Sequence, residues 1–413
     1  MTIKHYQTVQ DISLQDSLPN NGREGTWLGR AWLPAGFSPS GIAGPHVITI
    51  RGEDIVELSS SFKTIADVTR HPEPTAAVQQ ATGSTVCRLS ELFDNSLFHQ
   101  VPENIADADK PVLLAPNDIQ AIKAAGVTFA ASLIERVIEE RALGDAAKAE
   151  EIRAIVHSAI GDNLQDIVPG SEQAQALKEK LIAEGIWSQY LEVGIGPDTE
   201  VFTKSQPMSA IAHGSQLGIL ATSGWNNPEP EIAFLVSPEG KFLGATLAND
   251  VNLRDYEGRS ALLLGKAKDQ NGSCPIGPMF RLFDHTYSLA DAANAEVSLT
   301  ITGEDGFVSS GANIMSEISR TPGSIIAQVC NRSHQYPDGL TIMLGTMFAP
   351  TEDRAEPGMG FTHKVGDRVE ISSPKLGKLV NWVNYCDQIP TWHYSTADLI
   401  NFLLQVQQQQ LTR

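Results

Sequence analysis

The sequence predicts an α+β protein that is rich in β-structure. From residue 189 onward, runs of strand length alternate with turn signals every ~8–15 residues, which favours a mixed or all-β core. Residues 113–190 instead show mainly helical periodicity. Short strands come first, between residues 26 and 60. At 413 residues the chain is long enough for about two or three units.

We therefore predict a small N-terminal β domain at 1–112 and a larger unit at 113–413 that contains a helical insertion at about 117–186. Residues 1–25 are polar and carry turn formers, so we interpret them as a tail or loose cover. The first strand is predicted at 26–32. Two further strands, 45–51 and 55–58, form a hairpin around Gly52-Glu53-Asp54.

Helix signals dominate the next segment. Asn117 and Asp118 follow a proline and predict a helix at 119–125. Apolar residues at helical spacing predict a helix at 129–142, and a second one begins after Gly144. Ser171 is a suitable cap for a third helix, which ends at Gly185. Helices placed before a β-rich unit are natural candidates for a lid.

The remaining segments are predicted from strand-like runs. A C-terminal helix begins at the capping sequence Ser395-Thr-Ala-Asp398. The predicted strands are 190–195, 200–203, 217–221, 232–236, 241–247, 296–302, 306–309, 325–330, 341–347, 368–372 and 378–385.

Charge and composition exclude several classes of protein. The net charge of −19 argues against nucleic acid or an anionic membrane as the main partner. The four cysteines are scattered without a C-x-x-C pair, so they indicate neither a zinc knuckle nor a dense disulfide framework. No apolar run approaches ~18 residues and no basic-then-apolar leader opens the sequence, so we expect a cytoplasmic protein.

A metal site is indicated by three carboxylates. Glu229 and Glu231 flank a proline and are two residues apart, so in an extended segment both side chains project from one face. Asp250 follows two strand-length runs joined by a turn at 238–240, which returns it to the glutamates. Oxygen ligands of this kind suit Mg²⁺, with Mn²⁺ or Ca²⁺ as alternatives. Taken singly, such fragments are more often a solvated turn and a turn starter.

The motifs taken together resemble the fumarylacetoacetate hydrolase superfamily. They are E-P-E, N-D-V-x-x-R-D at 249–255, a lysine six residues before C-P-I-G-P, L-G-T-M-F at 344–348 and a later G-D-R-V-E. The resemblance covers about residues 115–390 and implies a mixed β-roll core. It also implies that Glu229, Glu231 and Asp250 bind Mg²⁺ or Mn²⁺ and that Lys268 lies in the active site.

Within the superfamily, three segments resemble dehydratases that act on 2-keto-3-deoxy-pentonates derived from xylonate or arabinonate. They are the G-V-T-F-x-x-S-x-x-x-R stretch at 126–136, Glu257 where many hydrolases carry Gln, and A-K-D-Q-N-G-S at 267–273. The catalytic histidine of the eukaryotic-type hydrolases has no counterpart after Glu200, and the nearest, His213, is expected to be structural. Acylpyruvate hydrolase, oxaloacetate decarboxylase and a non-catalytic metal-binding protein stay open as alternatives.

The resemblance also implies roles for the remaining candidates. Glu200 would be an acid or base that touches the metal directly or through water, and Lys268 either a base or an electrostatic clamp. A 2-keto-3-deoxy sugar acid would lose water to give 2-oxoglutarate semialdehyde. Members of the superfamily are usually dimers or dimers of dimers, so a homodimer or homotetramer is expected. The expected substrate-binding residues are Thr128, Ser132, Arg136, Gly345 and Thr346.

Overall fold

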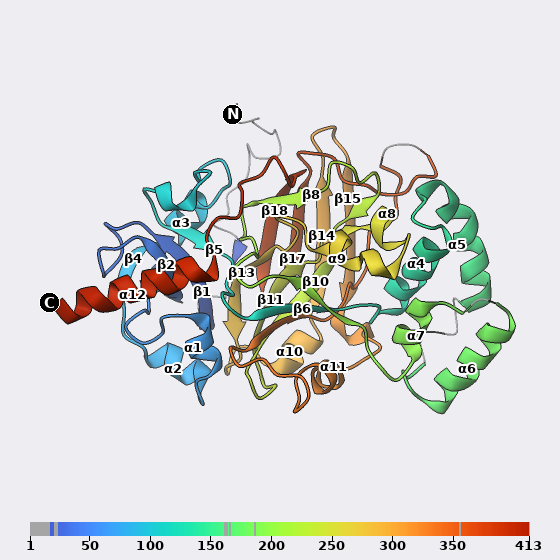
Figure 1. Cartoon of the computed structure of the whole chain (residues 1–413), viewed down its shortest axis with the longest axis horizontal. Helices are drawn as coiled ribbons and strands as arrows, with labels where there is room; N and C mark the ends of the chain where they lie inside the picture. The colour runs from blue at the N-terminus through green and yellow to red at the C-terminus, as the bar shows by residue number, and fades with distance from the viewer. Residues whose placement is uncertain are drawn as a thin grey trace.

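The computed structural model describes residues 17–19, 24–160, 164, 167–185, 187–354 and 357–412. Most of the predicted N-terminal tail, 1–25, lies outside these residues. Two β-sheets form the centre of the molecule and helices lie at its two ends (Figure 1). The fold is therefore α+β and β-rich, as predicted.

Within the described residues the larger sheet has eleven strands. Its order is β4 (Ser84–Arg88), β3 (Asp54–Glu57), β2 (Gly44–Arg51), β1 (Thr26–Leu33), β13 (Ile276–Leu282), β11 (Phe242–Asn249), β10 (Pro230–Val236), β16 (Leu340–Met343), β6 (Ala121–Ala125) and β7 (Val201–Ser205), with β5 (Val112–Leu114) beside β1.

Strand β1 joins the N-terminal part of this sheet to the rest. It pairs with β2 on one side and continues into pairing with β13, where Trp27 is opposite Arg281. The predicted boundary at residue 112 thus separates segments that share one continuous sheet. Whether residues 1–112 fold as an independent domain stays a prediction.

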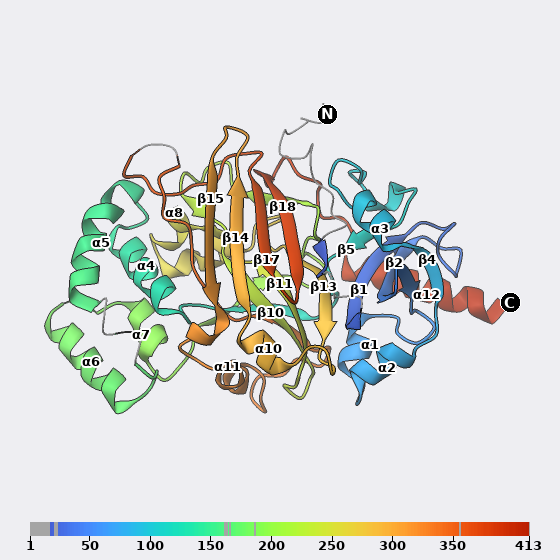
Figure 2. The same cartoon turned by 180° about the vertical axis from the view of Figure 1, so that it is seen from behind.

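The second sheet has five strands and packs face to face on the first (Figure 2). A large apolar core lies between the two sheets and includes Phe234 and Leu247 of the first and Leu299 and Ile371 of the second. The order is β15 (Val308–Ile314), β14 (Glu296–Thr302), β17 (Arg368–Ser373), β18 (Gly377–Tyr385) and β8 (Gln216–Ile219). A separate pair, β9 (Asn226–Asn227) and β12 (Asn252–Leu253), lies beside the predicted metal ligands.

The predicted helical insertion forms a unit with its own apolar core at one end of the molecule (Figure 1). Helix α4 (Ala130–Arg141), α5 (Ala146–Ile160) and α6 (Glu172–Ala183) confirm the three predicted helices there. Ser171 caps α6 by accepting a hydrogen bond from the Ala174 N–H. Gly185, with φ of +68°, follows its last turn as expected.

The other helices are short, except for the last. They are α1 (Ile65–Thr69), α2 (Pro74–Gln80), α3 (Leu89–Asn95), α7 (Gln189–Ile195), α8 (Arg254–Glu257), α9 (Leu264–Lys268), α10 (Leu289–Ala293), α11 (Pro322–Val329) and α12 (Thr396–Thr412). Helix α12 confirms the predicted C-terminal helix, and its Phe402 packs so closely on β2 that a Cβ at Gly44 would lie 2.4 Å from the ring.

The predicted helix at 119–125 is wrong, because this segment is strand β6. Asp118 does not cap a helix; its carboxylate accepts hydrogen bonds from the Ile65 N–H and the Gln120 amide. β6 pairs with β16 and β7, and these tertiary pairings override the local helix propensity.

Two predicted strands are also wrong. The segment 190–195 is helix α7, whose start is fixed by Ser188 accepting hydrogen bonds from the N–H groups of Tyr190 and Leu191. The segment 325–330 belongs to α11, which begins with Thr321 as cap and Pro322 in the first turn. Both starts use ordinary capping residues, and the short apolar runs behind them do not distinguish helix from strand.

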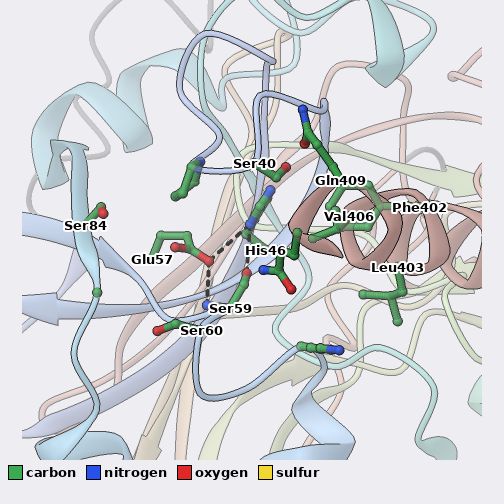
Figure 3. Close-up of a pocket in the computed structure, with 14 residues that line it drawn as sticks. Ser40, His46, Glu57, Ser59, Ser60, Ser84, Phe402, Leu403, Val406 and Gln409 are labelled. Atoms are coloured by element: carbon green, nitrogen blue, oxygen red, sulfur yellow. Dashed lines mark hydrogen bonds and ion pairs between the residues drawn. The ribbon is translucent and has the colours of Figure 1, made fainter. Parts of the chain in front are cut away.

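A cavity of about 180 Å³ lies under α12 in the N-terminal part of the molecule (Figure 3). His46 Nδ1 is 3.2 Å from Glu57 Oε1 and 2.8 Å from Ser59 Oγ, and the Ser59 N–H donates to the same glutamate oxygen. These groups satisfy one another and tie β2 to the end of β3. We therefore assign them a structural role.

Candidate active site

The three predicted metal ligands meet at one end of the β10–β11 hairpin. Register pairs Glu231 with Ala248 and Pro230 with Asn249, and the Asp250 N–H donates to the Glu229 carbonyl at 2.9 Å. One oxygen from each of Glu229, Glu231 and Asp250 lies within 4.8 Å of the others. All three residues are at most 2% exposed. The predicted convergence is confirmed.

Three cations stand directly against these carboxylates: Lys268, Arg136 and Lys204, which is 3.0 Å from Asp250 Oδ1. Lys268, at the end of α9, donates to Glu229 Oε2 at 2.6 Å and to Asp250 Oδ2 at 2.9 Å. Arg136 reaches in from α4 and donates to Glu229 Oε1. The helical unit therefore contacts the acidic cluster through a single long side chain, and Arg136 is itself buried.

The loop after β16 closes another side of the cluster. The Gly345 N–H donates to Glu231 Oε2 at 2.6 Å, and the Thr346 hydroxyl donates to Glu229 Oε2 at 2.9 Å. Gly345 has a φ of +110°, and a Cβ there would lie 1.9 Å from Thr128 Oγ1, so only glycine fits. Thr128 holds this loop by donating to the Leu344 carbonyl at 2.6 Å.

The predicted substrate-binding residues thus divide by what they contact. Gly345, Thr346 and Arg136 touch the carboxylates, whereas the Thr128 hydroxyl donates to the loop backbone and the Thr128 carbonyl accepts hydrogen bonds from Ser319. The Ser132 hydroxyl donates to the Phe129 carbonyl in its own helix at 2.9 Å, so the structure does not bring it to the cluster.

Glu200 stands at the start of β7, opposite Gly126. A Cβ at Gly126 would lie 2.0 Å from Glu200 Oε2, so this glycine provides the space that the carboxylate occupies. Burial, reinforced by the charge of Glu257, raises the pKa of Glu200 to about 7. A carboxyl group with a pKa near neutrality is suited to both giving and taking a proton.

Protonation within the cluster follows from burial and charge. Burial raises the pKa of Glu231 well above its usual range, and the nearby Asp250 and Glu229 carboxylates add to the shift. Burial acts on Glu229 in the same direction, but Arg136 and Lys268 outweigh it and hold its pKa well below the usual value. Burial by itself would lower the pKa of Lys268, but the Asp250 and Glu229 carboxylates outweigh this effect and raise the pKa above its usual value. The Lys268 side chain is therefore an ammonium.

The donor set fits a hard divalent cation. All three side chains offer carboxylate oxygens, which Mg²⁺ and Ca²⁺ prefer. The high pKa of Glu231 records the repulsion between carboxylates that an ion placed among them would relieve. Binding would then displace a proton from Glu231, because a metal ligand must be ionised.

Sequence reasoning noted Arg254 and Glu257 only as parts of motifs and missed the other charged residues around the site. Glu139 and Glu257 both face Arg136, at 2.5 Å and 3.4 Å, and Arg254 pairs with Glu139 at 3.1 Å. The spacing of Arg136 and Glu139 on one helix is a signal that was available. Lys204 is fully buried beside Asp250. Its alternation with Glu200 along one strand would have placed both on one face.

His213 is held in the core, as expected. Its Nδ1 accepts a hydrogen bond from the Val380 N–H at 3.0 Å, and its ring packs edge-on against Phe93. Burial lowers its pKa to about 3, so the imidazole is neutral. These contacts assign it to packing between β18 and α3.

Comparison with models of known protein families finds a match that includes most of these residues. Residues 193–384 match the model of the fumarylacetoacetate (FAA) hydrolase C-terminal domain. This segment is a fumarylacetoacetate hydrolase family domain. It contains Glu200, the three carboxylates, Lys268 and the Gly345–Thr346 loop. Thr128, Ser132 and Arg136 precede the matched segment and come from the helical unit or the turn before it.

Curated relatives of the fumarylacetoacetate hydrolase domain include two named as dehydratases. The 2-dehydro-3-deoxy-D-arabinonate dehydratase of Saccharolobus solfataricus is 30% identical over 181 residues, 44% of this chain and 57% of that protein. A probable 2-keto-3-deoxyxylonate dehydratase of Haloferax volcanii is 29% identical over 194 residues, 47% and 63% of the two chains. The chain therefore spans less than two thirds of the length of either relative.

Solved structures share the fold over a longer part of the chain. An apo 2-keto-3-deoxy-D-arabinonate dehydratase superposes with a TM-score of 0.55 at 19% identity, covering 87% of this chain and 99% of the other. The same enzyme complexed with magnesium and 2,5-dioxopentanoate gives a TM-score of 0.54 at 18% identity, with the same coverage. At this identity the likeness concerns the fold.

Among the described residues, no helix is both long and apolar enough to cross a membrane.

Proposed function

We propose that this protein is a divalent-metal-dependent dehydratase that converts a 2-keto-3-deoxy-pentonate into 2,5-dioxopentanoate, the semialdehyde of 2-oxoglutarate. The observation that carries the proposal is the buried cluster of Glu229, Glu231 and Asp250 with the Lys268 ammonium against it and Glu200 nearby. The names of the two dehydratase relatives support the substrate class.

The metal site is proposed to take Mg²⁺, with Mn²⁺ or Ca²⁺ as substitutes. Glu229, Glu231 and Asp250 would hold the ion. When bound, it would act as a Lewis acid on the carboxylate and keto oxygens of the substrate.

Lys268 supplies positive charge beside the substrate's C2 oxygen in this proposal. Its pKa lies above the usual value, which favours an electrostatic clamp over a base. An ammonium buried away from water stabilises developing oxyanion charge far better than one in solvent, since little water screens it. The Gly345 N–H donates to Glu231 and the Thr346 hydroxyl donates to Glu229, so both groups lie beside the proposed metal site. There they would orient the carboxylate of the substrate.

Glu200 is proposed to remove the C3 proton and to return a proton to the departing C4 hydroxyl. Arg136 would contact the polyol end or the substrate carboxylate from the helical unit. Elimination removes one hydrogen from C3 and the hydroxyl from C4. Two hydrogen shifts follow: one moves a hydrogen from C5 to C3 and gives an enol, and the second moves the hydrogen of the C5 hydroxyl to C4 and gives the aldehyde, so overall one water leaves.

Activity is expected to rise with pH through about 7, because Glu200 acts as a base only when ionised and its pKa is about 7. Replacing Glu200 by Gln should lower kcat by ~10²–10⁴-fold, the usual contribution of a positioned acid or base, and remove this rising limb. The pH profile of kcat/KM for both proteins checks this. A Gln variant that keeps the limb would assign it to another group.

The function itself is tested with a coupled assay. Metal-stripped protein, reloaded with Mg²⁺, is given 2-keto-3-deoxy-D-xylonate and its arabinonate-derived counterpart. A semialdehyde dehydrogenase reports product formation, and Glu229→Gln serves as the inactive control. Turnover that requires both Mg²⁺ and Glu229 is the expected result, and the preferred sugar acid identifies the pathway of pentose breakdown.

A second candidate comes from a more distant relative. The mitochondrial oxaloacetate tautomerase of Rattus norvegicus is 29% identical over 173 residues, 38% of this chain and 49% of that protein. Oxaloacetate and an acylpyruvate therefore belong in the same assay. Their consumption without turnover of either sugar acid would move the protein to the hydrolase, decarboxylase or tautomerase branch and leave the metal site in place.

A non-catalytic metal-binding role predicts thermal stabilisation by Mg²⁺ with no turnover of any of these compounds.

We further propose that the enzyme works in the cytoplasm as a homodimer or homotetramer. Light scattering of the purified protein measures the subunit number.

A further inference from the structure

Lys204 is a buried cation to which the motifs assign no role. It belongs to β7 and is 0% exposed. Its ammonium donates hydrogen bonds to the main-chain carbonyls of Val251, at 3.2 Å, and Lys268. It also forms an ion pair with Asp250 Oδ1 at 3.0 Å. A lysine this deeply buried is costly to the fold unless its charge is compensated, and Asp250 provides that compensation.

The two oxygens of Asp250 face two different ammonium groups. Lys268 is 2.9 Å from Oδ2, and Lys204 is 3.0 Å from Oδ1. In the part of the chain that the structure describes, the Lys268 ammonium contacts the side chains of Glu229 and Asp250 and the ring of Phe202, and no main-chain hydrogen bond anchors it. It is therefore free to shift by rotating its own side chain when a cation enters.

The Lys204 ammonium, in contrast to that of Lys268, is held in place by the main chain. Two main-chain carbonyls hold it, and the Lys268 carbonyl is itself fixed by the Ser273 hydroxyl at 2.8 Å. A cation on Asp250 Oδ1 would stand against this immobile positive charge. Coulomb repulsion at such distances is strong in a buried site, so the ion is directed to Oδ2.

We propose that Lys204 sets the ion preference of the site by keeping Asp250 a one-oxygen ligand. Mg²⁺ takes six ligands at about 2.0–2.1 Å in strict octahedral geometry, whereas Ca²⁺ takes about six to eight and readily accepts both oxygens of one carboxylate. Restricting Asp250 to Oδ2 favours Mg²⁺ over Ca²⁺. Lys204 is thus a positioning residue, and its role depends on the metal site of the proposed function.

The test compares ion affinities, which do not require turnover. Chelator-stripped protein is titrated calorimetrically with Mg²⁺ and separately with Ca²⁺, for the natural sequence and for Lys204→Met. Lys123→Met is the matched control: Lys123 lies on the neighbouring strand β6 and bonds the Thr203 hydroxyl at 2.7 Å on the other face of the sheet. Lys204→Gln keeps a donor for the carbonyls without the charge and serves if the Met variant does not fold.

The natural protein is expected to bind Mg²⁺ more tightly than Ca²⁺. Loss of the Lys204 charge should shift the affinity ratio toward Ca²⁺ by about tenfold or more, since Asp250 can then offer both oxygens. The ratio should not move in the Lys123 variant. A role limited to packing would lower stability and leave the ratio as it was.

Three outcomes overturn the inference. A natural protein that binds Ca²⁺ at least as tightly as Mg²⁺ contradicts it without any variant. An unchanged ratio in a folded Lys204 variant that still binds both ions contradicts it while the metal site stands. If neither ion binds to the natural protein, the cluster is not a metal site, and both this inference and the proposed function are wrong.

Discussion

Replacing Glu231 by Gln is expected to abolish metal binding while leaving the metal-free protein intact. Burial raises the pKa of Glu231, and the neutral Gln amide has the same shape as the carboxyl group, so the substitution should disturb the metal-free packing little. Removing one carboxylate from a three-carboxylate site should weaken Mg²⁺ by roughly a hundredfold or more, because ligand charge sets affinity. Calorimetric titration and melting curves with and without Mg²⁺ measure this, and dehydratase turnover should disappear with it.

The matched control is Glu239→Gln. Glu239 is an exposed carboxylate in the turn of the same hairpin, where it accepts a hydrogen bond from the Ser237 hydroxyl. Its replacement should change neither Mg²⁺ binding nor turnover. If the Glu231 variant still shows full stabilisation by Mg²⁺, the ion binds elsewhere and the assignment of the cluster as a metal site is wrong.

Replacing Lys268 by Met is expected to separate metal binding from catalysis. The ammonium now competes with any cation for Glu229 and Asp250, so its loss should tighten Mg²⁺ binding. Turnover should nevertheless fall by ~10²–10³-fold, the usual cost of removing one charge that stabilises an oxyanion. Without metal the variant should also melt at a lower temperature, because two buried carboxylates lose a shared cation.

Lys266→Met provides the comparison for this variant. Lys266 lies two residues away on the same short helix but is exposed, over the ring of Tyr256. Its removal should leave turnover and metal affinity unchanged. Tighter Mg²⁺ binding together with unchanged turnover in the Lys268 variant would show that this lysine balances charge in the empty site and takes no part in the reaction.

The convergence of the three carboxylates was predictable from sequence because their geometry is local. Glu229 and Glu231 share one strand, and one turn brings Asp250 back beside them, so strand periodicity and a hairpin suffice. The charges that complete the site come from elements far away in the chain. Arg136 lies 93 residues before Glu229, and only the packing of α4 against the sheet brings the two together.

The three wrongly predicted elements, β6, α7 and α11, have a related cause. Asn117 and Asp118 after a proline predict a helix at 119–125, whereas the conformation of this segment as β6 is decided by pairing with β16, more than two hundred residues later. Helices α7 and α11 were predicted as strands because runs of about six apolar residues fit either period. Their caps, Ser188 and Thr321, were the local features that distinguish the two.

The hairpin that carries all three carboxylates has a consequence for how the chain folds. Its contacts span few residues, and contacts of low sequence separation form early because closing a short loop costs little entropy. The cations that balance these charges come from 18 residues downstream for Lys268 and 93 residues upstream for Arg136. Lys268 is no further from Asp250 in sequence than Glu231 is, so of these two cations only Arg136 has to wait for a distant element to pack. In the proposed metal site, a divalent cation would relieve the repulsion that remains until Arg136 arrives, and would thereby favour the folded hairpin.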